Sequence, residues 1–184
     1  MSDDPVAATR AWLERGVIGL NLCPFARAPH AAGRVRIVLS PAASPAELLS
    51  DLCDELRALA AADPEEIETT LLVHPGTLAD FLDHNDFLDV VDAALAELEL
   101  EGEIQVVAFH PDFRFEGAAP DDPGNLTNRS PHPMLQLLRE ASVERALEAG
   151  ADADAIVERN LATLRRLGLE GWRAVLAADA PPGR

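Results

Sequence analysis

The sequence predicts an α/β fold: a small, mainly parallel sheet of three to four strands in βαβαβ order, flanked by about five helices. Three short apolar runs carry this prediction, because each ends in a polar residue followed by proline, at Ser40-Pro41, His74-Pro75 and His110-Pro111. The intervals of 34 and 36 residues match the length of a βαβ unit, and each contains one apolar pattern of helical period. A length of 184 residues is typical of one domain.

The N-terminal segment predicts a helix that ends before a Cys-Pro turn. Asp4-Pro5 is typical of a helix start, because Asp caps the free N–H groups and proline suits the first turn. Apolar residues then recur at helical spacing as far as Ile18. Pro24 disfavours helical backbone at Cys23, so we expect the helix to stop there.

Two strand-and-helix units and a third strand follow. The first strand is predicted at 35–39, and Ser44-Pro45-Ala46-Glu47 is a capping box that opens a leucine-rich helix. The second strand is predicted at 69–73, with Thr77 as the cap of the helix after it. The third strand is predicted at 104–109, where β-branched and apolar residues gather again.

The C-terminal third begins with a long segment of weak pattern. Alternation in Phe113-Arg114-Phe115 predicts one further short strand, whereas residues 116–133 show no periodicity. A loop of that length inside a domain is often functional. Two helices are predicted after it, one from Met134 to Leu147 and one beginning at Asp152. We expect one domain over 1–176 and a disordered tail over 177–184.

Composition bounds the class of protein and its partners. The net charge of −17 opposes binding to nucleic acid or to an anionic membrane surface. No apolar run reaches the roughly 18 residues that span a bilayer, and the N-terminus does not resemble a secretory signal, so we expect an acidic cytoplasmic protein. All 15 basic residues are arginine, a coding bias typical of a GC-rich bacterial genome.

The end of the long loop supplies the candidate substrate-binding residues. Asn128, Arg129, Ser130 and His132 stand directly before the helix expected at Met134. A helix N-terminus presents unpaired N–H groups and a positive dipole end, and an arginine adds a bidentate fork for carboxylate or phosphate. This pattern predicts a site for a small anionic molecule.

The candidate catalytic residues are His110, Asp112 and Cys23. The carboxylate of Asp112 stands two residues after His110 and would fix the imidazole tautomer for a general base. Cys23 is a possible nucleophile, although the end of the preceding helix would raise its pKa. The sequence lacks the GxGxxG, GxxxxGK[ST], HExxH and GxSxG motifs.

Three segments of the chain have a distinctive composition. They are Val17-Ile18-Gly19-Leu20-Asn21-Leu22-Cys23-Pro24-Phe25-Ala26, His110-Pro111-Asp112-Phe113, and Asn125-Leu126-Thr127-Asn128-Arg129-Ser130-Pro131-His132-Pro133 with Leu137-Leu138-Arg139-Glu140. Through these segments, which together frame nearly the whole chain, the sequence resembles a bacterial family, domain of unknown function 1415. The resemblance supplies relatives but implies no activity.

Three hypotheses of function follow from these residues. The first is a cytoplasmic enzyme, a hydrolase or transferase, that acts on a small anionic metabolite at a pocket formed by loop 125–133 and the carboxyl ends of the strands. The second is a metal- or haem-binding protein that uses Cys23, His110 and His132. The third is a non-catalytic ligand-sensing or interaction module. The sequence leaves the cofactor open.

Overall fold

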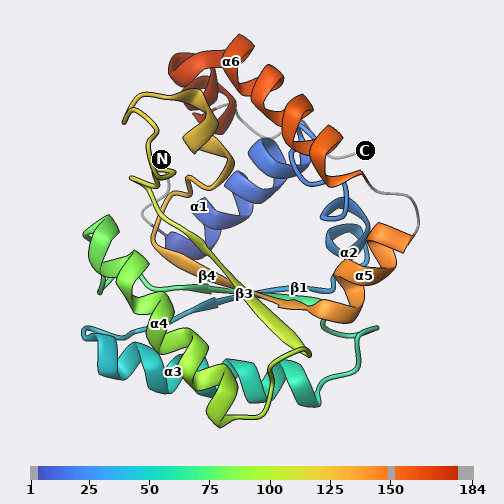
Figure 1. The fold of residues 1–184 in the computed structure, drawn as a ribbon, viewed down its shortest axis with the longest axis vertical. Helices are drawn as coiled ribbons and strands as arrows, with labels where there is room; N and C mark the ends of the chain where they lie inside the picture. Colours follow the sequence, from blue (N-terminus) through green and yellow to red (C-terminus); the bar gives the residue numbers. More distant parts are fainter. Residues whose placement is uncertain (1–3, 149–151, 178–184) are drawn as a thin grey trace.

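A mixed four-stranded sheet lies between two layers of helices in the computed structural model, which describes residues 4–148 and 152–177 (Figure 1). The strand order is β1-β2-β4-β3. Strands β1 and β2 are parallel, while β4 runs antiparallel to both β2 and β3. The strands are β1 (Val35–Leu39), β2 (Thr69–Val73), β3 (Ile104–Phe109) and β4 (Met134–Arg139).

Different helices form the two layers. Two long helices cover one face of the sheet, and the N- and C-terminal helices cover the other (Figure 1). The first layer is α3 (Pro45–Ala61) and α4 (Phe81–Glu97). The second contains α1 (Pro5–Ala11), the π-helix η1 (Trp12–Ile18), α2 (Arg27–Ala31), α5 (Glu140–Glu148) and α6 (Ala153–Ala177), and a short 3-10 helix, η2 (Pro123–Thr127), lies in the long loop.

The α/β class and the first three strands are confirmed, but the prediction of a mainly parallel sheet is wrong. The difference is β4, which occupies residues predicted to begin a helix and inserts between β2 and β3. Met134, Leu135 and Leu137 are fully buried, as in a central strand covered on both faces. A short apolar run of this kind fits a buried helix and a buried strand equally well, because periodicity does not separate them.

Three smaller predictions also need correction. The helix expected from Met134 begins at Glu140. Residues 113–115 form no strand; instead the Phe113 ring packs edge-on against Phe81, with ring centroids 5.3 Å apart. The cap of α4 is Asp80, whose carboxylate accepts hydrogen bonds from two backbone N–H groups, and not Thr77.

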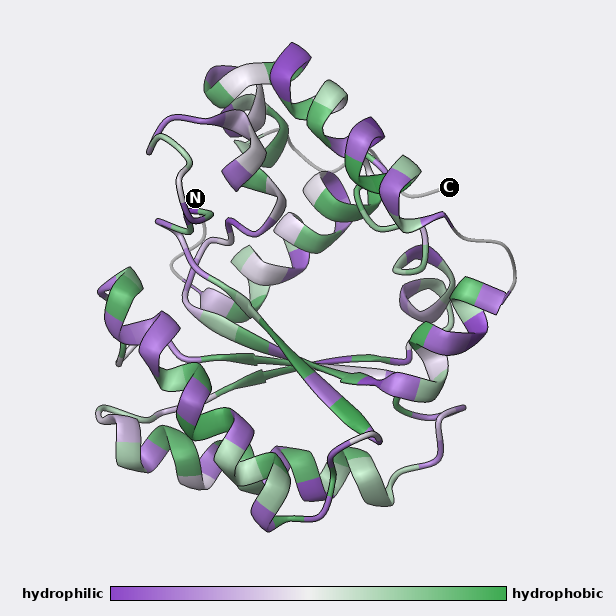
Figure 2. Ribbon diagram, in the orientation of Figure 1, coloured by the Kyte–Doolittle hydropathy of each residue, from purple (hydrophilic) through white to green (hydrophobic). Residues whose placement is uncertain are grey.

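Each sheet face has its own hydrophobic core, because alternate residues of a strand point to opposite sides. On β2, Leu72 packs against α3 and α4, while Leu71 and Val73 pack against the N- and C-terminal helices. Figure 2 shows apolar residues along the strands and polar residues interspersed along the surrounding helices. All five residues of β2 are buried.

Two tryptophans fix the π-helix η1 in place. The indole Nε1 of Trp12 donates to the backbone oxygen of Arg129 at 2.8 Å, which joins the helix to the long loop. Gly16 lies against Trp172 of α6, and a Cβ at that glycine would come within 2.9 Å of the indole ring. π-Helical segments often occur at functional sites, and this one borders the cavity described next.

Candidate functional site

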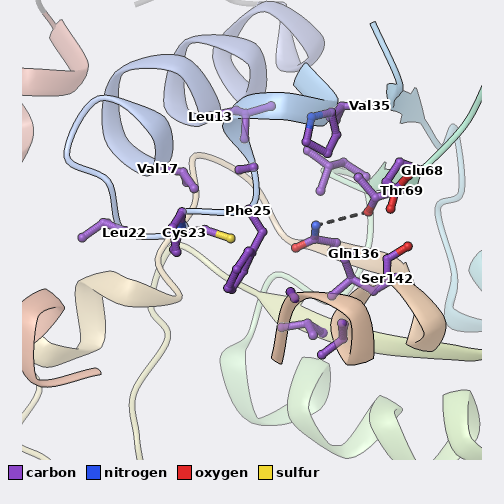
Figure 3. Close-up of a pocket in the computed structure, with 18 of the residues that line it drawn as sticks. Leu13, Val17, Leu22, Cys23, Phe25, Val35, Glu68, Thr69, Gln136 and Ser142 are labelled. Atoms are coloured by element: carbon purple, nitrogen blue, oxygen red, sulfur yellow. Dashed lines mark hydrogen bonds between the residues drawn. The ribbon is translucent and has the colours of Figure 1, made fainter. Parts of the chain in front are cut away.

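A cavity of about 640 Å³ lies between the sheet and the second helical layer (Figure 3). Its size is typical of a small-molecule site, and its walls are mostly apolar. All four strands contribute, together with η1, the Cys-Pro-Phe turn and α5. The apolar wall includes Leu13, Val17, Phe25, Leu71, Val107 and Phe109.

Gln136 and Thr69 form a polar strip on the sheet side of the cavity. The hydroxyl of Thr69 donates to the carbonyl oxygen of Leu137 at 2.7 Å, so its oxygen is left to accept. The Gln136 Nε2 group donates to that oxygen at 3.2 Å. This network fixes the amide orientation, and Gln136 therefore turns its carbonyl oxygen into the cavity, toward Cys23 and Phe25 (Figure 3).

A second amide, Asn160 of α6, lines the cavity from the other side. Its Nδ2 donates to the backbone oxygen of Leu22 at 2.7 Å. A carbonyl oxygen only accepts, so this bond also fixes the amide orientation. Asn160 is only 8% exposed, and its side-chain oxygen Oδ1 is buried without a hydrogen-bond partner. An unpaired buried acceptor is costly, so it marks a place for a donor.

The thiol of Cys23 lies on the same wall and points into the cavity (Figure 3). Burial raises its pKa, while hydrogen bonds from the backbone at Phe25 and Ala26 oppose that rise. These donors arise because Cys23 begins the turn that leads into α2, and the Ala26 N–H also bonds the Cys23 carbonyl at 3.2 Å. The unfavourable end of the preceding helix, expected from the sequence, is thus not the largest influence on this thiol.

Charged side chains at the cavity margin are paired with one another. Glu68 lies 3.5 Å from the guanidinium of Arg145 and 3.8 Å from that of Arg34. Arg145 also donates to the hydroxyl of Ser142 at 2.9 Å. Glu68, Ser142 and Arg145 all line the cavity, so its one lining arginine is already engaged within the described structure.

The predicted catalytic residues are not brought together. Cys23 lines the cavity, whereas His110 continues the β3 face that packs on α4, where its ring lies 5.7 Å from Phe81. Its Nε2 bonds the Leu78 carbonyl at 3.3 Å, and its Nδ1 accepts from the backbone N–H of Asp112 at 3.1 Å. Both ring nitrogens are occupied, so His110 is not poised as a base toward the cavity.

His110 belongs instead to a cluster of three buried histidines, His74, His84 and His110. The rings of His74 and His84 stack with centroids 5.2 Å apart, and His84 lies at the same separation from His110. Burial lowers the pKa of His74 to about 4 and that of His84 to about 3, and it also lowers the pKa of His110. The cluster is therefore neutral at pH 7.

His84 is the member that sequence reasoning missed. It lies on the acidic helix α4, yet its exposed fraction is zero. The signal was present in the spacing: His84, Phe87 and Val91 recur on one face of α4, and all three are buried. Neither ring nitrogen of His84 has a hydrogen-bond partner.

The predicted anion-binding residues hold the long loop in place. Arg129 donates from Nε to the Phe113 carbonyl at 3.1 Å and from Nη2 to the Pro120 carbonyl at 2.6 Å. The Asn128 amide donates to Ala108. Ser130 donates to the backbone oxygen of His132, and burial lowers the pKa of the His132 ring. Since the loop leads into β4, the helix N-terminus that was to complete the anion site is absent.

Family comparison matches residues 4–174 to the family described as "Protein of unknown function (DUF1415)". The chain belongs to this family. A search of curated proteins found no match, and neither did a search of solved structures. The resemblance drawn from the sequence segments is confirmed.

The segments that carry the family resemblance have different roles in this DUF1415 protein. The Leu22-Cys23-Pro24-Phe25-Ala26 run lines the cavity. The other segments mostly fix the backbone: the buried Asn125 amide, for example, bonds the backbone at Phe115 and Ala119. In this chain the three segments thus contribute one wall of the cavity and a tightly bonded loop.

Metal and membrane sites receive no support from the part of the chain that is described. No group of three His, Cys, Asp or Glu side chains there is arranged to hold a metal ion. The stacked His74 and His84 rings illustrate why, because their in-plane lone pairs do not converge. No helix among the described residues is long and apolar enough to cross a membrane.

Proposed function

We propose that this DUF1415 protein binds a small, mainly apolar molecule in the cavity between its sheet and its second helical layer. The single observation that carries the proposal is the cavity itself, with its mostly apolar walls and the polar groups of Cys23, Gln136 and Asn160 among its lining. A few placed polar groups on an apolar wall are typical of pockets that orient a ligand. The proposal is closest to the third hypothesis, a ligand-sensing module.

Covalent chemistry at Cys23 is a second candidate, on one observation. The sulfur receives backbone hydrogen bonds from Phe25 and Ala26, and such donors stabilise a thiolate. No histidine is among the residues that line the cavity, so a Cys–His pair is not assembled within the described chain. A transferase-type reaction would therefore need a base other than histidine.

The small anionic ligand predicted from the sequence has weaker support. Its two elements were a helix N-terminus at Met134 and a free guanidinium at Arg129. The first is replaced by a strand, and the second bonds loop carbonyls. A cytoplasmic location and the absence of nucleic-acid or membrane partners stay predictions from charge and composition.

Filling the cavity from α5 is the test of the proposal. Ala146 lines the cavity, and the Ala146→Phe variant would place a ring there. We expect the fluorescent probe N-phenylnaphthylamine to bind the unaltered protein and to bind Ala146→Phe at least about tenfold more weakly, since lost space costs about 1.4 kcal/mol or more of binding. Fluorescence titration measures both affinities.

The matched control lies on the same helix. Ala141 is exposed and is not among the cavity residues, so Ala141→Phe adds an equal ring outside the cavity. It should bind the probe like the unaltered protein, and circular dichroism should show the same fold for all three. Probe binding that Ala146→Phe leaves unchanged, or no binding to the unaltered protein, would contradict the proposal.

A further inference from the structure

The polarity of the cavity follows from the two amides whose orientations are fixed. Gln136 gives its N–H to Thr69, and Asn160 gives its N–H to the Leu22 carbonyl. Each amide therefore uses one N–H within the protein and leaves its oxygen to accept from the cavity side. The Asn160 oxygen is the stronger indication, because it is buried and unpartnered.

No free cationic side chain faces these acceptors among the described lining residues. The lining residues within the described chain include no lysine and no histidine, and their single arginine, Arg145, is paired with Glu68. The hydrogen bonds at Cys23 come from the backbone to the sulfur, which leaves the thiol proton as the one donor of that residue. Of the lining hydroxyls, those of Thr69 and Thr127 donate to carbonyl oxygens, and that of Ser142 accepts from Arg145. Among the described lining residues, the buried side-chain atom that lacks a partner is therefore an acceptor, the Asn160 oxygen.

We infer that the ligand of this cavity carries hydrogen-bond donors, a hydroxyl or an amine, on an apolar body, and that it is not a carboxylate or phosphate. A donor would satisfy the Asn160 and Gln136 oxygens, whereas an anion would face two carbonyl dipoles of the same sign without a free cation. The inference rests on the proposed function and specifies the class of its ligand. It replaces the anionic metabolite predicted from the sequence.

Three probes of similar shape test the inference by displacing N-phenylnaphthylamine. Phenethyl alcohol has a donor, phenethyl methyl ether has only an acceptor at the same place, and phenylpropanoate is an anion. We expect the alcohol to displace the dye at a concentration at least about tenfold lower than the ether or the anion, the usual penalty for leaving a buried polar group unpaired. Equal potency of alcohol and ether, or a preference for phenylpropanoate, overturns the inference.

A variant locates the effect at one of the two oxygens. Gln136→Leu removes the amide and keeps a side chain of similar size, so the preference for alcohol over ether should shrink to about threefold or less while dye binding persists. An unchanged preference in this variant, with dye still bound, contradicts the role of Gln136. Should Gln136→Leu fail to fold, the comparison of alcohol with ether on the unaltered protein still decides the inference.

The outcomes separate this inference from the proposed function. If the dye and all three probes fail to bind the unaltered protein, the proposed function is wrong, and the ligand class falls with it. If the dye binds and Ala146→Phe weakens it, but the alcohol shows no advantage, the cavity is a binding site and only the ligand class is wrong.

Discussion

Acidification from about pH 7 to about pH 5 is expected to lower the free energy of unfolding by about 4 kcal/mol through His74 and His84. Both rings are buried and neutral, and burial holds their pKa values at about 4 and about 3 against 6.5 for a free histidine. Each histidine lowers the free energy of unfolding by roughly 2 kcal/mol at about pH 5, because the unfolded side chain is protonated there and the folded one is not.

The sign follows from which state takes up protons first. Below pH 6.5 the unfolded chain binds protons that the folded cluster refuses, so stability falls as pH falls until the folded pKa values are reached. No carboxylate among the causes of their pKa shifts relieves His74 or His84. Only His110 has such neighbours, since Asp112 and Asp80 favour its charged form.

Urea unfolding of the unaltered protein and of His84→Phe at both pH values measures this effect. Phenylalanine keeps a flat ring against His74 and cannot take up a proton, so the loss between the two pH values should shrink by about 2 kcal/mol. The control is His30→Gln, because His30 is a partly exposed histidine paired with Glu14 at 3.2 Å. Identical pH dependence in His84→Phe and the unaltered protein would show that the cluster does not resist protonation.

The first three strands could be predicted from local patterns, and β4 could not. Residues 35–39, 69–73 and 104–109 combine β-branched residues with proline shortly after each run, and both are local properties. Residues 134–139 are apolar on both faces because β4 is a central strand, and that position is decided by pairing with β2 and β3. Tertiary pairing here overrides a local pattern that fits a helix equally well.

The candidate site shows the same limit. Cys23 could be singled out because a thiol near a helix end is a possible nucleophile, and it does line the cavity. Gln136 and Asn160 could not, since Gln136 reaches the cavity only when β4 is a strand and Asn160 only when α6 folds back against Leu22. The polar loop residues attracted attention for the opposite reason, because hydrogen bonds that hold a loop use the same side chains as hydrogen bonds that hold a ligand.

Replacing Arg139 with alanine is expected to cost about 2–4 kcal/mol of stability, because several hydrogen bonds to a charged group are lost at once. The guanidinium stands at the end of β4 and donates to the carbonyl oxygens of Leu59 at 2.7 Å, Ala62 at 2.8 Å and Ile67 at 3.1 Å. Leu59 and Ala62 lie at the C-terminal end of α3, where the helix dipole favours a cation.

The matched comparison for Arg139→Ala is Arg57→Ala on α3. Arg57 is exposed and makes one ion pair with Asp54, so its loss should change stability by less than about 0.5 kcal/mol. Arg139→Lys should recover only part of the stability, because an ammonium cannot reproduce the planar fork that reaches three carbonyls together. Urea denaturation of the three variants measures their free energies of unfolding and so ranks their stabilities. If Arg139→Ala loses no more than Arg57→Ala, this guanidinium does not hold α3 to the sheet, and another contact must fix the end of that helix.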